Sequence, residues 1–111
     1  MIFHITSRTA WEAALGAGIY EADSLSTEGF IHCSTAEQYV WVANQRFRGR
    51  TDLVLLHIDE TRLPSEVRYE NLEGGVPLFP HVYGAIPIRA VLNVTPLRPL
   101  EDGSFGGQTP S

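Results

Sequence analysis

Residues 52–59 read DLVLLHID, a run of apolar side chains enclosed by two aspartates. Successive side chains of a strand point to opposite faces of a sheet, and this stretch is apolar at both sets of positions. It is therefore predicted to be a central strand that is covered on both faces. A histidine inside so apolar a run is expected to be half-buried and hydrogen-bonded, so His57 carries no functional prediction.

Four further strands are expected around this one, at residues 2–6, 30–33, 67–72 and 91–97. Each stretch is short and rich in apolar or β-branched side chains. The segment GGVPLFPH at residues 74–81 is expected to be a turn-rich connection, because Pro77 and Pro80 exclude a helix. Residues 20–29 are polar and are predicted to form a loop with one short turn.

Two helices are predicted, both before residue 50. Thr9 and Glu12 match a capping box at the start of a helix over residues 9–15, and Ser34 and Glu37 match another at the start of a second helix. These elements predict a single α+β domain over residues 1–100, with a mixed or antiparallel sheet. The Gly-, Ser- and Pro-rich residues 101–111 are expected to be a mobile tail.

Charge and composition indicate which kinds of binding partner and which cellular compartment are expected. The formal net charge is −5, which argues against DNA or another nucleic acid as a bulk electrostatic partner. The single cysteine cannot form an internal disulfide and favours a reducing compartment. No signal peptide and no apolar run of membrane-spanning length is evident, so a cytoplasmic protein with no membrane partner is expected. A monomer is expected as well.

A histidine followed two residues later by a hydroxyl-bearing residue occurs three times. Because residues i and i+2 share one face of an extended segment, each pair can project from a sheet in one direction. We predict that His4, Thr6, His32, Ser34 and His81 line one cleft, although three unrelated surface pairs would give the same spacing. The pairs are His4 with Thr6, His32 with Ser34, and His81 with Tyr83.

Other chemistries find less support in the spacing. The histidines and the cysteine show no spacing typical of a zinc site, and Cys33 is expected to be a small core residue that faces away from His32. Neither a Gly-x-Ser-x-Gly elbow nor a phosphate-binding glycine loop occurs. The amides at the start of the second helix could instead hold an anion beside His32 and Ser34. Gln38, one helical turn after Ser34, could face the same cleft.

Several of these motifs together resemble a known family. FHIT at residues 3–6, EGFIHCSTAEQ at 28–38, DLVLLHID at 52–59, RYE at 68–70 and FPHVYGAIP at 79–87 are similar to the pattern of the DUF952 family. At the level of the fold, that family is similar to ADP-ribosyltransferases and RNA 2′-phosphotransferases. The resemblance implies a cleft between two small sheets that takes NAD or an ADP-ribose-like group.

The resemblance also assigns roles to residues of this chain. His4 and Thr6 match a first segment that contacts a ribose, and His32, Ser34 and Thr35 match a second. The third segment often supplies a glutamate that stabilises positive charge on the ribose, but His81 and Tyr83 stand there. The nearest acid is Glu70. The candidate catalytic residues are therefore His32, His81 and Glu70, and the candidate ligand-binding residues are His4, Thr6, Ser34, Thr35, Gln38 and Tyr83.

Three hypotheses follow from this reading. The first is a domain that binds NAD or an ADP-ribose-like ligand, with NAD as a possible transferase substrate. The second is a non-catalytic binding module for another small anionic metabolite. The third, a cysteine- or metal-based redox enzyme, ranks last. The direction of Glu70 separates the first two, because the transfer reaction needs an acid inside the cleft.

Overall fold

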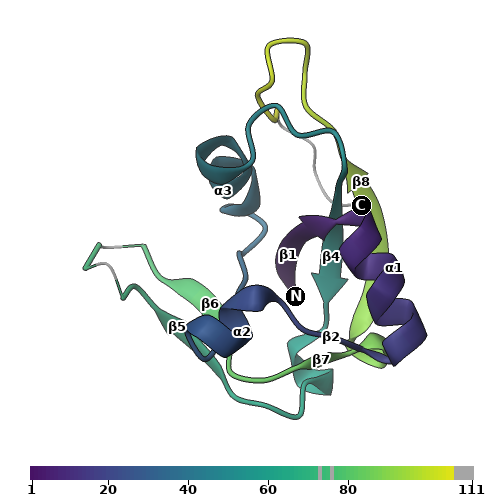
Figure 1. Ribbon diagram of the computed structural model, residues 1–111. Helices are drawn as coiled ribbons and strands as arrows, with labels where there is room; N and C mark the ends of the chain where they lie inside the picture. The colour runs from purple at the N-terminus through teal and green to yellow at the C-terminus, as the bar shows by residue number, and fades with distance from the viewer. Residues whose placement is uncertain (73, 76, 107–111) are drawn as a thin grey trace.

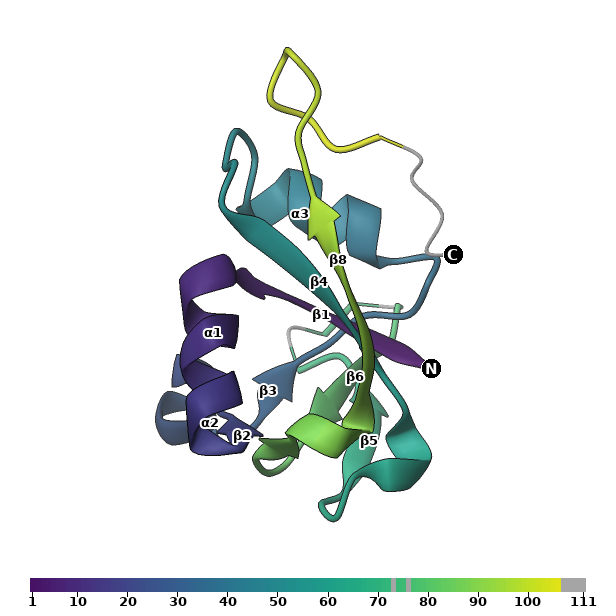
Figure 2. The same ribbon diagram turned by 90° about the vertical axis from the view of Figure 1, so that its right-hand side faces the viewer.

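The computed structural model describes residues 1–72, 74–75 and 77–106, and its centre is a three-stranded antiparallel sheet. Strand β4 (Leu53–Ile58) lies between β1 (Ile2–Ser7) and β8 (Val91–Leu97), and all six β4 residues are buried. The prediction of a central strand is confirmed. Figure 2 shows β1, β4 and β8 crossing the middle of the molecule.

A second antiparallel sheet has the strand order β3-β6-β5, formed by β3 (Ile31–His32), β6 (Phe79–Val82) and β5 (Val67–Glu70). Strand β6 replaces part of the connection expected at residues 74–81, so that expectation was wrong from Phe79 onward. Pro80 fits inside the strand because it still offers a carbonyl, which accepts a hydrogen bond from the amide of Cys33 at 3.0 Å. Figure 1 shows β5 and β6 reaching outward together.

The remaining elements are short. Strands β2 (Ile19–Tyr20) and β7 (Ile86–Pro87) pair with each other, and two 3₁₀ turns cover Glu60–Arg62 and Ile88–Ala90. Helix α2 (Asp23–Thr27) lies in the stretch predicted to be a loop. The described residues therefore contain three α-helices instead of the two predicted.

Helix α1 (Arg8–Ala17) begins earlier than predicted. Its N-cap is Ser7, whose hydroxyl accepts a hydrogen bond from the amide of Ala10 at 3.1 Å, so the capping box expected at Thr9 and Glu12 was wrong. The helix ends at Gly18, which has a φ of 84°. That left-handed conformation is a common helix stop for glycine.

Helix α3 (Tyr39–Arg46) also begins elsewhere than predicted. The backbone of Ser34 pairs with Phe3 through hydrogen bonds of 2.7 and 2.8 Å, which keeps this residue extended instead of starting a helix. The capping box of Ser34 and Glu37 is therefore not formed. Gln38 directly precedes α3. Its Oε1 accepts a hydrogen bond from the amide of Thr35 at 3.0 Å, and its Nε2 donates one to the carbonyl of Leu78 at 2.7 Å.

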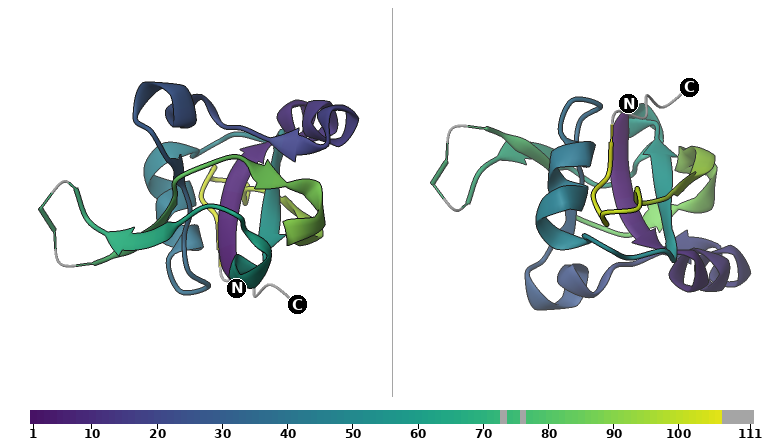
Figure 3. Two further views of the ribbon diagram at one scale, coloured as in Figure 1. Left: turned by 90° about the horizontal axis from the view of Figure 1, so that it is seen from below. Right: turned by 90° about the horizontal axis from the view of Figure 1, so that it is seen from above.

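Helices α1 and α3 lie on opposite sides of the central sheet (Figure 3), and a hydrophobic cluster forms under each of them. Trp11 of α1 belongs to the first cluster, and Tyr39 of α3 belongs to the second. Phe105 joins the second cluster and is 3% exposed. The folded chain thus extends past the domain boundary expected at residue 100; the tail residues 107–111 lie outside the described part.

No helix in the described ranges is long and apolar enough to cross a lipid bilayer.

Candidate functional site

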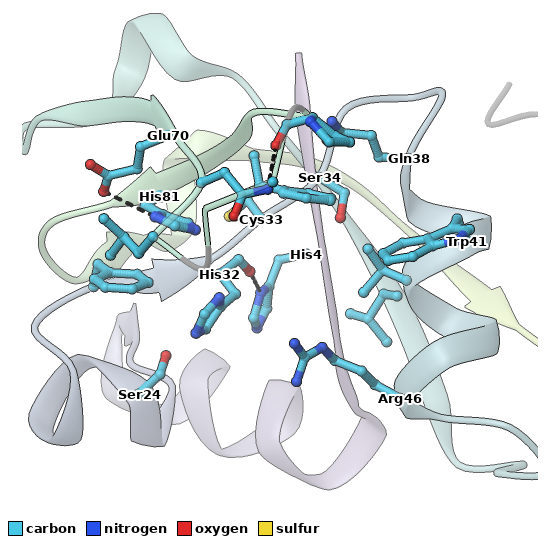
Figure 4. A pocket seen from close by; sticks show the side chains of 18 of the residues that line it. His4, Ser24, His32, Cys33, Ser34, Gln38, Trp41, Arg46, Glu70 and His81 are labelled. Carbon is cyan, nitrogen blue, oxygen red and sulfur yellow. Dashed lines mark hydrogen bonds and ion pairs between the residues drawn. The ribbon is translucent and has the colours of Figure 1, made fainter.

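A pocket of about 1060 Å³ opens where β1, β3, the β5–β6 pair and α3 meet (Figure 4). Its wall is mostly apolar, with polar and charged side chains set into it. It therefore has the general character of a small-molecule site. Six of the side chains predicted from the sequence line it: His4, His32, Ser34, Gln38, Glu70 and His81.

His4 forms part of the pocket floor through a fixed hydrogen-bond network. Its Nδ1 donates to the carbonyl of His32 at 2.5 Å, and its Nε2 lies 2.8 Å from the hydroxyl of Tyr20. That hydroxyl also hydrogen-bonds with Thr6 Oγ1 at 2.9 Å. Burial lowers the pKa of His4 to about 4, so this imidazole is neutral at neutral pH and Nδ1 carries its proton. Both ring nitrogens are thus engaged by the protein.

The other two histidines of the pocket are cross-strand partners. His32 of β3 and His81 of β6 pair in register, and their rings meet edge to face with centroids 5.2 Å apart. Phe30 stacks on His81 with ring centroids 4.1 Å apart and contacts His32 edge to face. His32 is half exposed and its Nε2 lies 3.0 Å from Glu28 Oε2, whereas His81 is buried.

Glu70 reaches the pocket from β5, which the sequence left undecided. Its Oε1 accepts hydrogen bonds from His81 Nδ1 at 3.0 Å and from the hydroxyl of Tyr83. The hydrogen bond from Tyr83, and after it the one from His81, lower the pKa of Glu70. The hydrogen bond to Glu70 in turn raises the pKa of Tyr83. The guanidinium of Arg68 lies 4.6 Å from the Tyr83 ring centroid. Glu70 is therefore a carboxylate at neutral pH, held at the pocket wall.

Three predicted residues do not line the pocket. Thr6 lies behind His4 in the Tyr20 network, and Tyr83 contacts the site through Glu70 and the ring of Phe30. The amide of Thr35 is taken by Gln38 Oε1, which removes one of the donors expected for an anion at the start of the second helix. Cys33 is buried in the first hydrophobic cluster, and desolvation raises the pKa of its thiol. That environment is typical of a core cysteine and not of a nucleophile.

Sequence reasoning missed several pocket residues on α3 and near β3. Arg46 and Trp41 line the pocket from α3, and the Arg46 guanidinium points toward His4 (Figure 4). Glu28 and Phe30 come from the segment before β3. Helical spacing could have suggested Trp41, which lies three residues after Gln38. Over the residues that the structure describes, no three His, Cys, Asp or Glu side chains are grouped as metal ligands.

Comparison with known proteins agrees with this architecture. The chain belongs to DUF952, a family described as protein of unknown function, whose model matches residues 5–94. The crystal structure of protein CC0527 from Caulobacter crescentus is similar, with a TM-score of 0.84 and 34% sequence identity over 95% of this chain and 92% of that one. The solution NMR structure of CC0527 gives a TM-score of 0.81 and 35% identity, over 93% and 89% of the two chains. No curated protein matches this sequence.

Proposed function

We propose that the pocket binds NAD or an ADP-ribose-like ligand, and that the domain is related in fold to the ADP-ribosyltransferases. The observation that carries the proposal is the position of Glu70 in the same pocket as His4 and His32. Two small sheets flank this pocket, as the proposed relationship requires. Its volume of about 1060 Å³ is at the upper end of ordinary ligand pockets.

The charges in the pocket suit the two parts of such a ligand. Arg46 points its guanidinium into the pocket, where it can face phosphate oxygens. Glu70 supplies a carboxylate on the opposite side, near His81. A ribose that loses nicotinamide develops positive charge, and a preorganised acid there stabilises the transition state by about 3 kcal/mol.

ADP-ribosyl transfer is the reaction that this arrangement would serve. The bond between the ribose C1′ and the nicotinamide nitrogen breaks, and nicotinamide leaves with the electron pair. An acceptor nucleophile then bonds to C1′ and releases its proton to solvent water. Glu70 would balance the charge on the ribose during this exchange.

The internal bonds of the site favour a second candidate, a binding module without transfer activity. Both nitrogens of His4 are bonded within the protein, and Oε1 of Glu70 already accepts two hydrogen bonds. Groups that are already hydrogen-bonded within the protein keep the pocket in shape. They are less able to form new interactions with the charge that develops on a substrate during a reaction. Such a module could take another small anionic metabolite.

Calorimetric titration with NAD and ADP-ribose tests the proposal, together with a chromatographic assay for released nicotinamide. Binding should weaken as the salt concentration rises, because part of the attraction is electrostatic. The transferase is supported if nicotinamide release is lost in Glu70→Gln and kept in Glu12→Gln, a control at an exposed acid. Binding without release supports the binding module. If neither NAD nor ADP-ribose gives binding heat at millimolar concentration, neither nucleotide is the ligand. Another small anion would then remain as the candidate ligand.

A further inference from the structure

Trp41 and Tyr69 are the aromatic residues among the exposed large hydrophobic side chains of the described residues, and Trp41 is the more exposed of the two. It projects from α3 at the pocket and is 58% exposed, whereas Trp11 is 9% exposed in the core. Its ring stacks on Phe79 of β6 with centroids 6.2 Å apart and an angle of 28° between the planes. One part of the indole is thus backed by a second aromatic ring while more than half of the side chain faces solvent.

The two rings are held in place by the polar link next to them. Gln38 precedes Trp41 by three residues, and its side-chain amide donates to the carbonyl of Leu78, the residue before Phe79. This hydrogen bond ties the start of α3 to the start of β6, the elements that carry the two rings. The link fixes the elements that carry the aromatic pair relative to each other, so less conformational entropy is lost when a ligand settles on the rings.

The same helix also places a cation, Arg46, at the pocket. Arg46 extends from α3 toward His4 and His32, while Trp41 lies farther along the pocket wall (Figure 4). A ligand that contacts both residues must combine a planar apolar ring with an anionic group. The net charge of −5 disfavours a polyanionic strand, so a single nucleotide fits better than a nucleic acid.

We propose that Trp41 and Phe79 form a base-stacking subsite for a mononucleotide or dinucleotide, whose phosphate lies at Arg46. This inference rests on the proposed function and assigns the part of the pocket that would take the base of the ligand. Every base presents a flat π face to an aromatic ring, so the subsite selects for the presence of a base more than for its identity. The ribose then lies between the base and the histidines of the pocket floor.

The contribution of the subsite can be distinguished from that of the rest of the pocket by comparing three ligands. They are AMP, ADP-ribose and ribose 5-phosphate, the last of which lacks a base. Calorimetry on Trp41→Ala should show AMP and ADP-ribose bound about 10- to 100-fold more weakly, the usual effect of losing one stacked base. Ribose 5-phosphate should bind as it does to the wild type. Trp41→Phe should retain most of the affinity, and Leu15→Ala, at an exposed apolar side chain on α1 outside the pocket, is the matched control.

Tryptophan fluorescence gives a second readout that does not depend on heat. Since Trp11 is buried and Trp41 is exposed, AMP should quench the emission of the wild type and leave that of Trp41→Phe unchanged. Equal affinity of Trp41→Ala and the wild type for AMP and ADP-ribose would overturn the subsite while the proposed function stands. The absence of binding by all three ligands would overturn both. The protein could instead dimerise in a concentration-dependent way that Trp41→Ala abolishes and AMP does not affect. That result would assign the aromatic pair to a contact between two copies of the chain and overturn the subsite.

Discussion

His32 lies directly opposite His81 across β3 and β6, and the two imidazole rings meet edge to face with centroids 5.2 Å apart. Two histidines that are far apart in the chain thus become neighbours in one pocket wall. Their environments differ, because the side chain of His32 is 50% exposed and that of His81 is 7% exposed. This asymmetry predicts different consequences when each is removed.

Replacing His81 with alanine should lower the free energy of unfolding by about 2 kcal/mol, because a buried ring and its hydrogen bond to Glu70 are lost. His32→Ala should change it by less than about 0.5 kcal/mol, as is usual at an exposed position. Urea denaturation of both variants measures the difference. Equal losses would show that the two histidines do not have the packing described here.

Tyr83→Phe should raise the pKa of Glu70 toward its ordinary value, because the hydroxyl makes the largest contribution to lowering it. A lowered carboxyl pKa stabilises the fold above the unfolded-state pKa, and that stability is lost as the pH falls through the folded-state value. NMR titration of the labelled Glu70 side chain measures the shift. Tyr69→Phe, at an exposed tyrosine on the same strand as Glu70, is the control. An unchanged Glu70 pKa in Tyr83→Phe would contradict the hydrogen bond.

The stability of the protein should fall between pH 7 and pH 5, in part because of His4. Burial lowers the pKa of His4 from 6.5 to about 4, so the unfolded chain takes up a proton in this window while the folded chain does not. Stability from this group is present above pH 6.5 and declines as the pH falls toward 4, by about 2 kcal/mol at pH 5.

The variant His4→Gln isolates this contribution. Glutamine can still donate to the carbonyl of His32 but does not titrate, so its unfolding free energy should depend less steeply on pH over the same range. Burial lowers the pKa of His57 in the same direction, and that contribution remains in both proteins. Parallel pH profiles of the wild type and His4→Gln would rule out a neutral, buried His4.

Gln38→Ala should cost about 1 kcal/mol, because two hydrogen bonds at the start of α3 are lost. Glu37→Ala should be close to neutral, since Glu37 is exposed and does not cap the helix. Chemical denaturation of the two single variants compares the neighbours directly. A larger loss for Glu37→Ala would restore the capping box that the sequence suggested.

Phe105→Ala should destabilise the protein by about 3 kcal/mol, because its ring is buried in the cluster under α3. Asn44 holds the backbone of the same residue through hydrogen bonds of 2.7 and 2.9 Å. Asn44→Ala should therefore also lower the thermal unfolding midpoint, whereas Leu100→Ala, at an exposed side chain, should not. A protein that ends at residue 100 and keeps its full stability would show that the C-terminal segment is dispensable.

The sequence by itself determined the elements whose signal is local. The run DLVLLHID predicts the central strand because burial on both faces requires apolar residues at every position. Residues 91–97 were likewise predicted and found as β8. The start of α3 and the strand containing Pro80 were predicted less well, because they depend on distant partners. Ser34 is held extended by backbone hydrogen bonds with Phe3. Pro80 lies between Cys33, which donates to its carbonyl, and Tyr69 of β5.

The residues of the candidate site also fall into two groups: those that the sequence suggested and those that only the tertiary structure revealed. The sequence suggested His4, His32 and His81 for one cleft because each begins a polar pair on an extended segment. All three line the pocket, whereas Thr6 and Tyr83 do not. Only the tertiary structure showed that Glu70 faces His81, because their contact depends on the register of β5 against β6. It also turned His4 inward toward Tyr20 and placed Trp41 and Arg46 on the pocket wall. Hydrogen bonds and packing between segments far apart in the chain decide the directions of Glu70 and His4, which no local pattern encodes, whereas the spacing from Gln38 is a local signal for Trp41.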